Sequence, residues 1–80
     1  MEYVNKLPQA KHTIGTKEII KGIKAGNIKK VIIAENCPDN LIESIKASGT
    51  IDIMIFHGDQ KELATALGKP FCVASVGFEA

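Results

Sequence analysis

A chain of 80 residues is long enough for one compact domain and too short for two, and it can bury only about 60% of its unfolded surface. A hydrophobic fraction of 45% with 24% charged residues is typical of a small globular domain and argues against disorder. No apolar run approaches the roughly 18 residues of a membrane span and the first residues lack a secretory signal, so we expect a single cytoplasmic domain over residues 1–80 with no membrane partner.

Positive and negative charges are unevenly distributed along the chain. Residues 1–30 contain seven lysines against two glutamates, a balance of +5, whereas residues 31–80 contain three lysines against seven acidic residues, a balance of −4. If the fold keeps the first third together, one side of the domain presents a cationic field to a polyanion and the other side repels it. This polarity favours oriented docking over non-specific coating.

The first elements in chain order are a short strand and a helix. Residues 9–14 suggest a helix end and a brief strand, with Pro8 limiting any helix that spans it. Residues 15–26 predict an amphipathic helix, with Thr16 capping its start and Gly26 ending it. Isoleucines gather on one face and lysines on the opposite face, namely Ile19, Ile20 and Ile23 against Lys17, Lys21 and Lys24.

Strand and helix patterns then alternate. The continuous apolar run 31–34 predicts a central strand covered on both faces. A second helix is expected to start in residues 36–39, with Pro38 at its first position, and to end at Gly49. Apolar residues recur at every second position in 51–56, which predicts a strand near an edge of the sheet.

A third helix and a final strand complete the pattern. Asp59 followed by Glu62 is the signature of a capping box, and Gly68 with Pro70 closes the helix. Residues 71–76 predict the last strand. We therefore predict an α/β fold, a three-layer α-β-α sandwich around a mixed sheet of about four strands, with parallel pairing between most neighbours.

The two cysteines form no motif. Cys37 and Cys72 lie 35 positions apart without CxxC spacing, so neither a redox site nor a paired zinc site is indicated. Cys72 lies in an apolar run and is expected to be a small buried hydrophobe. Cys37 precedes a helix start, where a thiolate is favoured, yet a passive loop thiol is the simpler interpretation.

Catalytic motifs are absent from the sequence. His12 and His57 lie at no recognisable spacing from a Ser or Cys nucleophile, and there is no nucleophile elbow, Walker loop or dinucleotide fingerprint. Solvent or a structural hydrogen bond explains each histidine better than acid-base work. We expect no enzymatic activity and no cofactor.

The start of the first long helix is a better candidate for function. Gly15 lets another backbone approach closely, and the free amides of a first helical turn attract negative charge. Lys17 and Lys21 add cations beside those amides, while Glu18 can accept hydrogen bonds from a guanine edge. Such a mixture suits the reading of bases as well as backbone. A solvated lysine face on an amphipathic helix explains the same residues equally well.

Two long segments resemble a known family. IGTKEIIKGIKAGNIKKVIIAENCPD and ELATALGKPFCVASVGF are similar to the kink-turn RNA-binding ribosomal proteins, the superfamily that contains the archaeal and eukaryotic large-subunit proteins seven-Ae and thirty-e and bacterial relatives. The resemblance covers nearly the whole chain, and its Gly-Thr-Lys-Glu motif is fairly specific. Lys17 matches the bacterial relatives, whereas the loop with Pro70 and Phe71 is closer to the thirty-e branch, so the branch stays open.

The resemblance implies a set of RNA-binding positions. In members that bind kink-turn RNA, the helix start meets tandem sheared G·A pairs, with the following turn nearby and the loop before the last strand flanking the RNA. Lys17 and Glu18 would then reach base edges, and Lys21 would meet phosphates. Carried over to this sequence, the positions are Gly15, Thr16, Lys17, Glu18, Lys21, Glu35, Asn36, Lys69, Pro70, Phe71 and Cys72.

These observations predict an RNA-binding protein that recognises kink-turn-like RNA in the ribosome or another ribonucleoprotein. Its partners would be structured RNA, ribosomal RNA in the first place, and other ribonucleoprotein proteins. The alternative is a protein-interaction module on the same fold without specific RNA binding, for which the seven acids of residues 31–80 would supply an acidic face.

Overall fold

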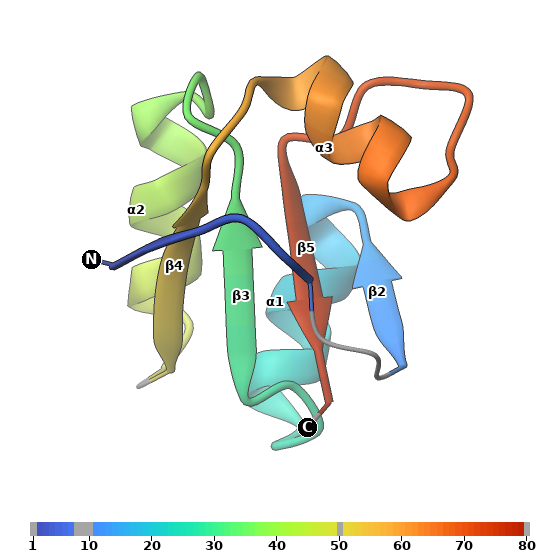
Figure 1. The fold of residues 1–80 in the computed structure, drawn as a ribbon. Coiled ribbons are helices and arrows are strands. Elements are labelled where there is room, and N and C mark those ends of the chain that lie inside the picture. The colour runs from blue at the N-terminus through green and yellow to red at the C-terminus, as the bar shows by residue number, and fades with distance from the viewer. Residues whose placement is uncertain (1, 8–10, 50, 80) are drawn as a thin grey trace.

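Three helices and five strands make up the parts of the chain that the computed structural model describes, residues 2–7, 11–49 and 51–79 (Figure 1). In chain order they are β1 (Glu2–Val4), β2 (His12–Ile14), α1 (Thr16–Lys24), β3 (Lys30–Ile33), α2 (Asp39–Ala47), β4 (Asp52–Phe56), α3 (Gln60–Leu67) and β5 (Ser75–Phe78). The brief strand expected before residue 15 is present as β2. The part of that prediction on residues 8–10 lies outside the described residues.

The strands form one mixed sheet in the order β1-β4-β3-β5-β2. β3 is central, as predicted, and β4 lies next to an edge strand. The prediction of mostly parallel pairing is wrong: β4 is parallel to β1 and β3, but β5 is antiparallel to both β3 and β2. The sheet has five strands rather than about four because the short β1 pairs with β4.

Helices cover both faces of the sheet, which confirms the three-layer arrangement (Figure 1). Alternation along β3 sends Val31 and Ile33 into a cluster with the apolar residues of α1 and α2. Ile32, between them, lies in the second cluster, with Leu63 and Ala64 of α3. The side chains of Val31, Ile32 and Ile33 are almost completely buried, which is why this part of β3 is continuously apolar.

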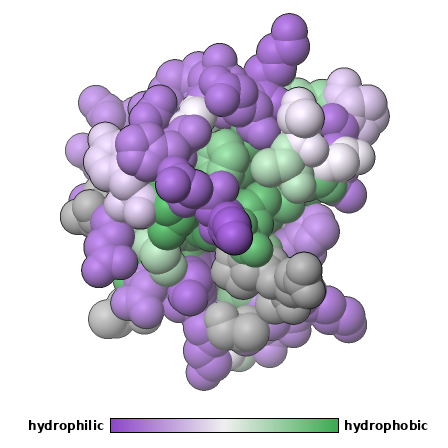
Figure 2. All heavy atoms as spheres, in the orientation of Figure 1, coloured by the Kyte–Doolittle hydropathy of each residue, from purple (hydrophilic) through white to green (hydrophobic). Residues whose placement is uncertain are grey.

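Hydrophobic side chains are visible at the surface of the face that carries α3 (Figure 2). Figure 2, in the orientation of Figure 1, shows hydrophobic side chains at the centre of the α3 face, framed by hydrophilic ones. The partly buried residues packed against the cluster on this face are Val4, Leu7, Ile14, Met54 and Leu67.

Close packing of α1 on the sheet depends on two glycines. Ile28 follows α1, is only 4% exposed, and its side chain lies between Gly22 of the helix and Gly77 of β5. A Cβ added to Gly77 would lie 2.8 Å from Ile28 Cδ1, and one added to Gly22 would collide with the same side chain. A larger residue at either position would force the buried Ile28 side chain to shift.

The helix ends follow the predicted signals in part. α1 ends at the glycine expected, because Gly26 has a φ of 80° directly after the C-cap residue Ala25. The prediction that Thr16 caps its start is wrong. Gly15 occupies the capping position with a φ of 98° and has no side chain, so no side-chain acceptor meets the first-turn amides.

The other two helices begin differently. α2 starts at Asp39, so Pro38 occupies the capping position and not the predicted first helical position, without a side-chain cap; the helix ends before the expected Gly49, which directly follows the C-cap Ser48. α3 has the predicted cap: an Asp59 carboxylate oxygen accepts a hydrogen bond from the Glu62 amide at 2.9 Å. Gly68, with a φ of 73°, ends α3 as expected.

The last strand begins later than predicted. β5 spans Ser75–Phe78 instead of residues 71–76, because the chain forms a loop beside α3 before it enters the sheet (Figure 1). Cys72 lies in this loop and is exposed, so its prediction as a buried hydrophobe is wrong. The buried positions of the segment begin at Val73, whose amide donates to the Gln60 carbonyl at 3.2 Å.

The Asp59 cap yields a stability prediction. Asp59→Ala leaves the Glu62 amide without its acceptor and is expected to lower the free energy of unfolding by about 1 kcal/mol. Asp59→Asn keeps an acceptor oxygen and should unfold close to the parent in urea titrations. Equal midpoints for the alanine variant and the parent would show that this cap does not stabilise the fold.

Candidate nucleic-acid interface

Three separate segments meet at one edge of the sheet, the upper edge in Figure 1, formed by the ends of β2, β3 and β4 and the start of β5. The register pairs Ile14 with Val76 and Ile33 with Ser75. Residues that directly follow β2 and β3 and those that precede β5 therefore lie at this edge. They include the α1 start at residues 15–18, the turn at 35–36 and the loop at 69–72, whereas Lys21 lies further along α1, beside a pocket that also contains Glu79 after the end of β5.

The α1 start is open to solvent. Gly15, Lys17, Glu18 and Lys21 are exposed, and Thr16 is half-buried. A Cβ on Gly15 would meet no atom within 4 Å, so glycine is needed here for its positive φ and not for lack of space. The uncapped amides of the first turn thus face an unobstructed surface at the positive end of the helix dipole.

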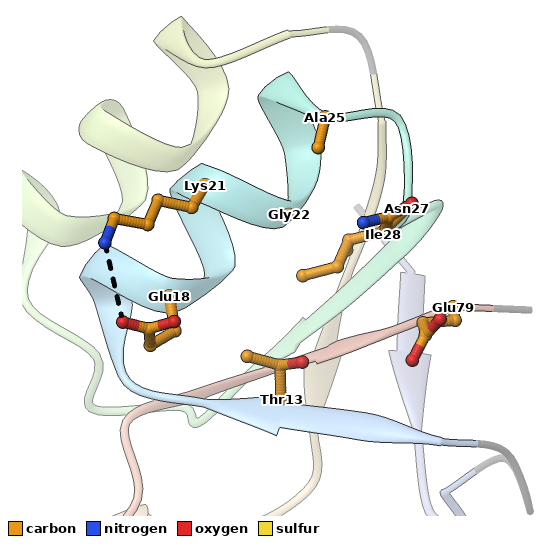
Figure 3. Close-up of a pocket in the computed structure, with 8 residues that line it drawn as sticks. All are labelled: Thr13, Glu18, Lys21, Gly22, Ala25, Asn27, Ile28 and Glu79. Carbon is orange, nitrogen blue, oxygen red and sulfur yellow. Dashed lines mark ion pairs between the residues drawn. The ribbon is translucent and has the colours of Figure 1, made fainter.

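Charged side chains lie beside these amides, and they are not tightly paired with each other. Lys21 Nζ lies 4.0 Å from Glu18 Oε1, and the two side chains are 78% and 63% exposed. Such a long exposed ion pair holds neither group strongly. Beside them is a surface pocket of about 310 Å³ between α1, β2 and the end of β5 (Figure 3), whose lining residues are Thr13, Glu18, Lys21, Gly22, Ala25, Asn27, Ile28 and Glu79.

The turn after β3 is tied to the start of α3. Asn36 Oδ1 accepts a hydrogen bond from the Gln60 amide at 3.0 Å, and the Asn36 carbonyl accepts from Gln60 Nε2 at 3.3 Å. Glu35 remains exposed, with its amide donating to the Gly58 carbonyl at 2.9 Å. Asn36 therefore connects this turn to the start of α3, while the Glu35 side chain is 45% exposed.

The loop before β5, residues 69–72, forms a second part of the upper edge, which we call its second arm. Pro70, Phe71 and Cys72 are exposed, Phe71 at 54%, and Lys69 is half-buried. They line a surface pocket of about 410 Å³ against α3, together with Lys61, Ala64 and Thr65. The Gln60 carbonyl anchors the end of this loop through Val73, so Gln60 connects the loop with the turn at Asn36.

Gln60 and His57 were not identified as site residues from the sequence. His57 Nδ1 lies 3.6 Å from Glu35 Oε1, and its amide donates to the Val4 carbonyl at 2.9 Å. Neither role leaves a local pattern in the sequence. Gln60 lies 24 residues from its partner Asn36, and His57 lies 22 residues from Glu35 and 53 residues from Val4. Only the strand order brings them together.

The charge distribution differs from the one expected. The first third does not stay together, since three strands separate β1 from β2 in the sheet. The segment of β2 and α1 nevertheless carries four of its seven lysines, Lys11, Lys17, Lys21 and Lys24, all exposed. The cationic region is therefore narrower than predicted and is centred on the β2 side of the molecule.

The two cysteines have opposite environments. Cys37 is buried, and desolvation together with the nearby Asp39 carboxylate raises the pKa of its thiol above the usual 9.0. The thiolate considered for this helix start is therefore disfavoured. Among the described residues no group of three His, Cys, Asp or Glu side chains is placed to hold a metal ion, and no helix there is long and apolar enough to cross a membrane.

These environments predict selective alkylation. At pH 8 iodoacetamide should modify Cys72 in the folded chain and reach Cys37 only after unfolding, because the thiolate is the reacting form and Cys37 is buried as a thiol. Intact-mass spectrometry checks this, with the urea-unfolded chain as control. Two modified cysteines in the folded chain would contradict the assignment.

Comparison with known proteins finds relatives with similar sequences. The chain is 38% identical over 65 residues to a large ribosomal subunit protein eL30 of Archaeoglobus fulgidus, covering 81% of this chain and 74% of the relative. An eL30 of Sulfurisphaera tokodaii is 35% identical, with coverages of 89% and 70%. These relatives are named as ribosomal proteins and not as enzymes.

Solved structures show the same fold. A Giardia lamblia 15.5kD RNA binding protein superposes with a TM-score of 0.67 at 17% identity, covering 86% of this chain and 60% of that one. A Bacillus halodurans protein of unknown function has the same TM-score at 16% identity. Residues 2–79 match the sequence profile of one family, and the chain belongs to it: the Ribosomal protein L7Ae/L30e/S12e/Gadd45 family.

Proposed function

We propose that this protein binds structured RNA containing a kink-turn or a related sharply bent motif, as a component of the ribosome or of another ribonucleoprotein. The observation that carries the proposal is the α1 start, where uncapped amides lie beside exposed lysines and an exposed glutamate. Its relatives are named large ribosomal subunit proteins, which makes ribosomal RNA the first ligand to test.

The α1 start contains the groups that an RNA backbone and its bases require. Free amides and the Lys21 ammonium suit phosphate oxygens, and the open backbone at Gly15 permits close approach. Glu18 can accept from the amino and imino groups of guanine, and Lys17 can donate to guanine acceptors. Phosphate contacts would position the RNA, and the two side chains would select its bases.

The second arm of the upper edge suits unpaired bases. A sharp bend in RNA unstacks bases, and aromatic rings are their usual protein partners. Phe71 presents an exposed ring in the loop that Gln60 anchors, and Lys69 adds a cation beside it. The Glu35–Asn36 turn is connected to this loop through Gln60.

A protein-interaction module remains the alternative because exposed acidic residues, among them Glu35 and Asp39, also lie at this edge. Gel shifts against a kink-turn RNA and the same RNA with its G·A pairs replaced, at two salt concentrations, separate the two functions. Binding of the intact motif alone supports the proposal. Equal, salt-sensitive binding of both RNAs indicates an unspecific cationic patch, and no binding of either favours the protein-interaction module.

Substitutions at the α1 start test the site itself. Lys17→Ala and Glu18→Ala should each weaken binding of the intact kink-turn RNA roughly 5- to 100-fold, since a base contact contributes about 1–3 kcal/mol. Lys46→Ala, in the last turn of α2, and Glu43→Ala, exposed on the same helix, are the matched controls and should bind like the parent. Unchanged affinity of both test variants would show that the α1 start is not the site.

Protection of Cys72 provides an independent test of the second arm. Saturating kink-turn RNA should slow alkylation of Cys72 several-fold, because this thiol lies beside Phe71 in the loop expected to flank the RNA. The RNA with replaced G·A pairs serves as the control and should leave the rate unchanged. An unprotected thiol in a saturated complex would remove the loop from the interface.

A further inference from the structure

An exposed aromatic pair lies on the β1 side of the upper edge, outside the residues assigned above. Tyr3 of β1 is 55% exposed and, with Phe71, is one of the two large hydrophobic side chains exposed in the described parts of the chain. Its ring centroid lies 4.7 Å from that of His57, with the ring planes tilted by 41°. The spacing is that of a true aromatic contact.

Backbone and side-chain contacts surround His57. The His57 amide donates to the Val4 carbonyl, which fixes the end of β4 against β1. On its other side, the His57 imidazole faces the Glu35 carboxylate at 3.6 Å. His57 thus lies between Tyr3 and Glu35, and its backbone bond to β1 places the imidazole beside the Tyr3 ring.

The pair lies on the same face of the sheet as α1. Tyr3 is in register with Ile55, and Ile55 with Ile33, both of which belong to the apolar cluster under α1 and α2. Successive strands lie about 4.8 Å apart, so the four steps from β1 to β2 span about 19 Å. A ligand long enough to cover the upper edge would reach both the α1 start and the aromatic pair.

We propose that Tyr3 and His57 form a stacking platform for an unpaired base of the bound RNA, beyond the bases read at the α1 start. This inference rests on the proposed RNA-binding function. Unpaired RNA bases stack on Tyr and His rings whatever their identity, so the platform would add affinity and orient the RNA without selecting sequence. The platform would mark the β1 end of the interface, as Lys17 and Glu18 mark its β2 side.

The test measures binding of the kink-turn RNA by the parent chain, Tyr3→Ala and Tyr3→Phe. Tyr3→Ala should bind roughly 5- to 100-fold more weakly, whereas Tyr3→Phe, which keeps the ring, should bind like the parent. Because stacking does not release counterions, the ratio between parent and Tyr3→Ala should be the same at two salt concentrations. Thermal unfolding of both variants establishes that they are folded.

A second arm of the experiment identifies the stacked base. The unpaired nucleotides of the RNA are replaced one at a time by abasic sites, and the loss caused by Tyr3→Ala should disappear for the RNA that lacks the stacked base. Parental affinity of a folded Tyr3→Ala variant would overturn the platform and leave the proposed function intact. Failure of the parent chain to bind the RNA would overturn both.

Discussion

The insertion of β5 between β3 and β2 is the constraint on which the rest of the molecule depends. Because β5 runs against both neighbours, β2 and β3 end at the edge where β5 begins. The start of α1, the Glu35–Asn36 turn and the loop before β5 are thereby brought to one edge from positions far apart in sequence. Gly77, within β5, also leaves the space that Ile28 needs for α1 to pack closely.

The same edge is stiffened by polar contacts that contribute little to the core. Gln60 is bonded to Asn36 through two hydrogen bonds and to Val73 through its carbonyl. The two apolar clusters stabilise the sheet and its helices and also take in loop residues such as Cys37 and Val73, and the polar contacts add to this at the surface. A small domain can therefore hold a rigid binding edge by using a few side-chain bonds at the points where its loops meet.

The local parts of this arrangement could be predicted from the sequence, and the non-local parts could not. The helical spacing of Ile19 and Ile23 predicted α1, and the apolar run at Val31–Ile33 predicted the central strand. Both patterns are local, because each arises from residues that are close together in the sequence. β1 escaped detection since three residues, two of them exposed and one half-buried, are too few to show a periodicity. The antiparallel direction of β5 and the exposure of Cys72 depend on how the chain returns from α3, which no local pattern encodes.

The two outermost strands have a consequence for the behaviour of the protein in concentrated solution. β1 and β2 are the edge strands of the sheet, and each is only three residues long. An open sheet edge presents unpaired backbone groups to which another chain can add a strand, and short edges limit that addition. A domain built in this way can remain resistant to edge-to-edge aggregation while its five-stranded sheet stays open on both sides.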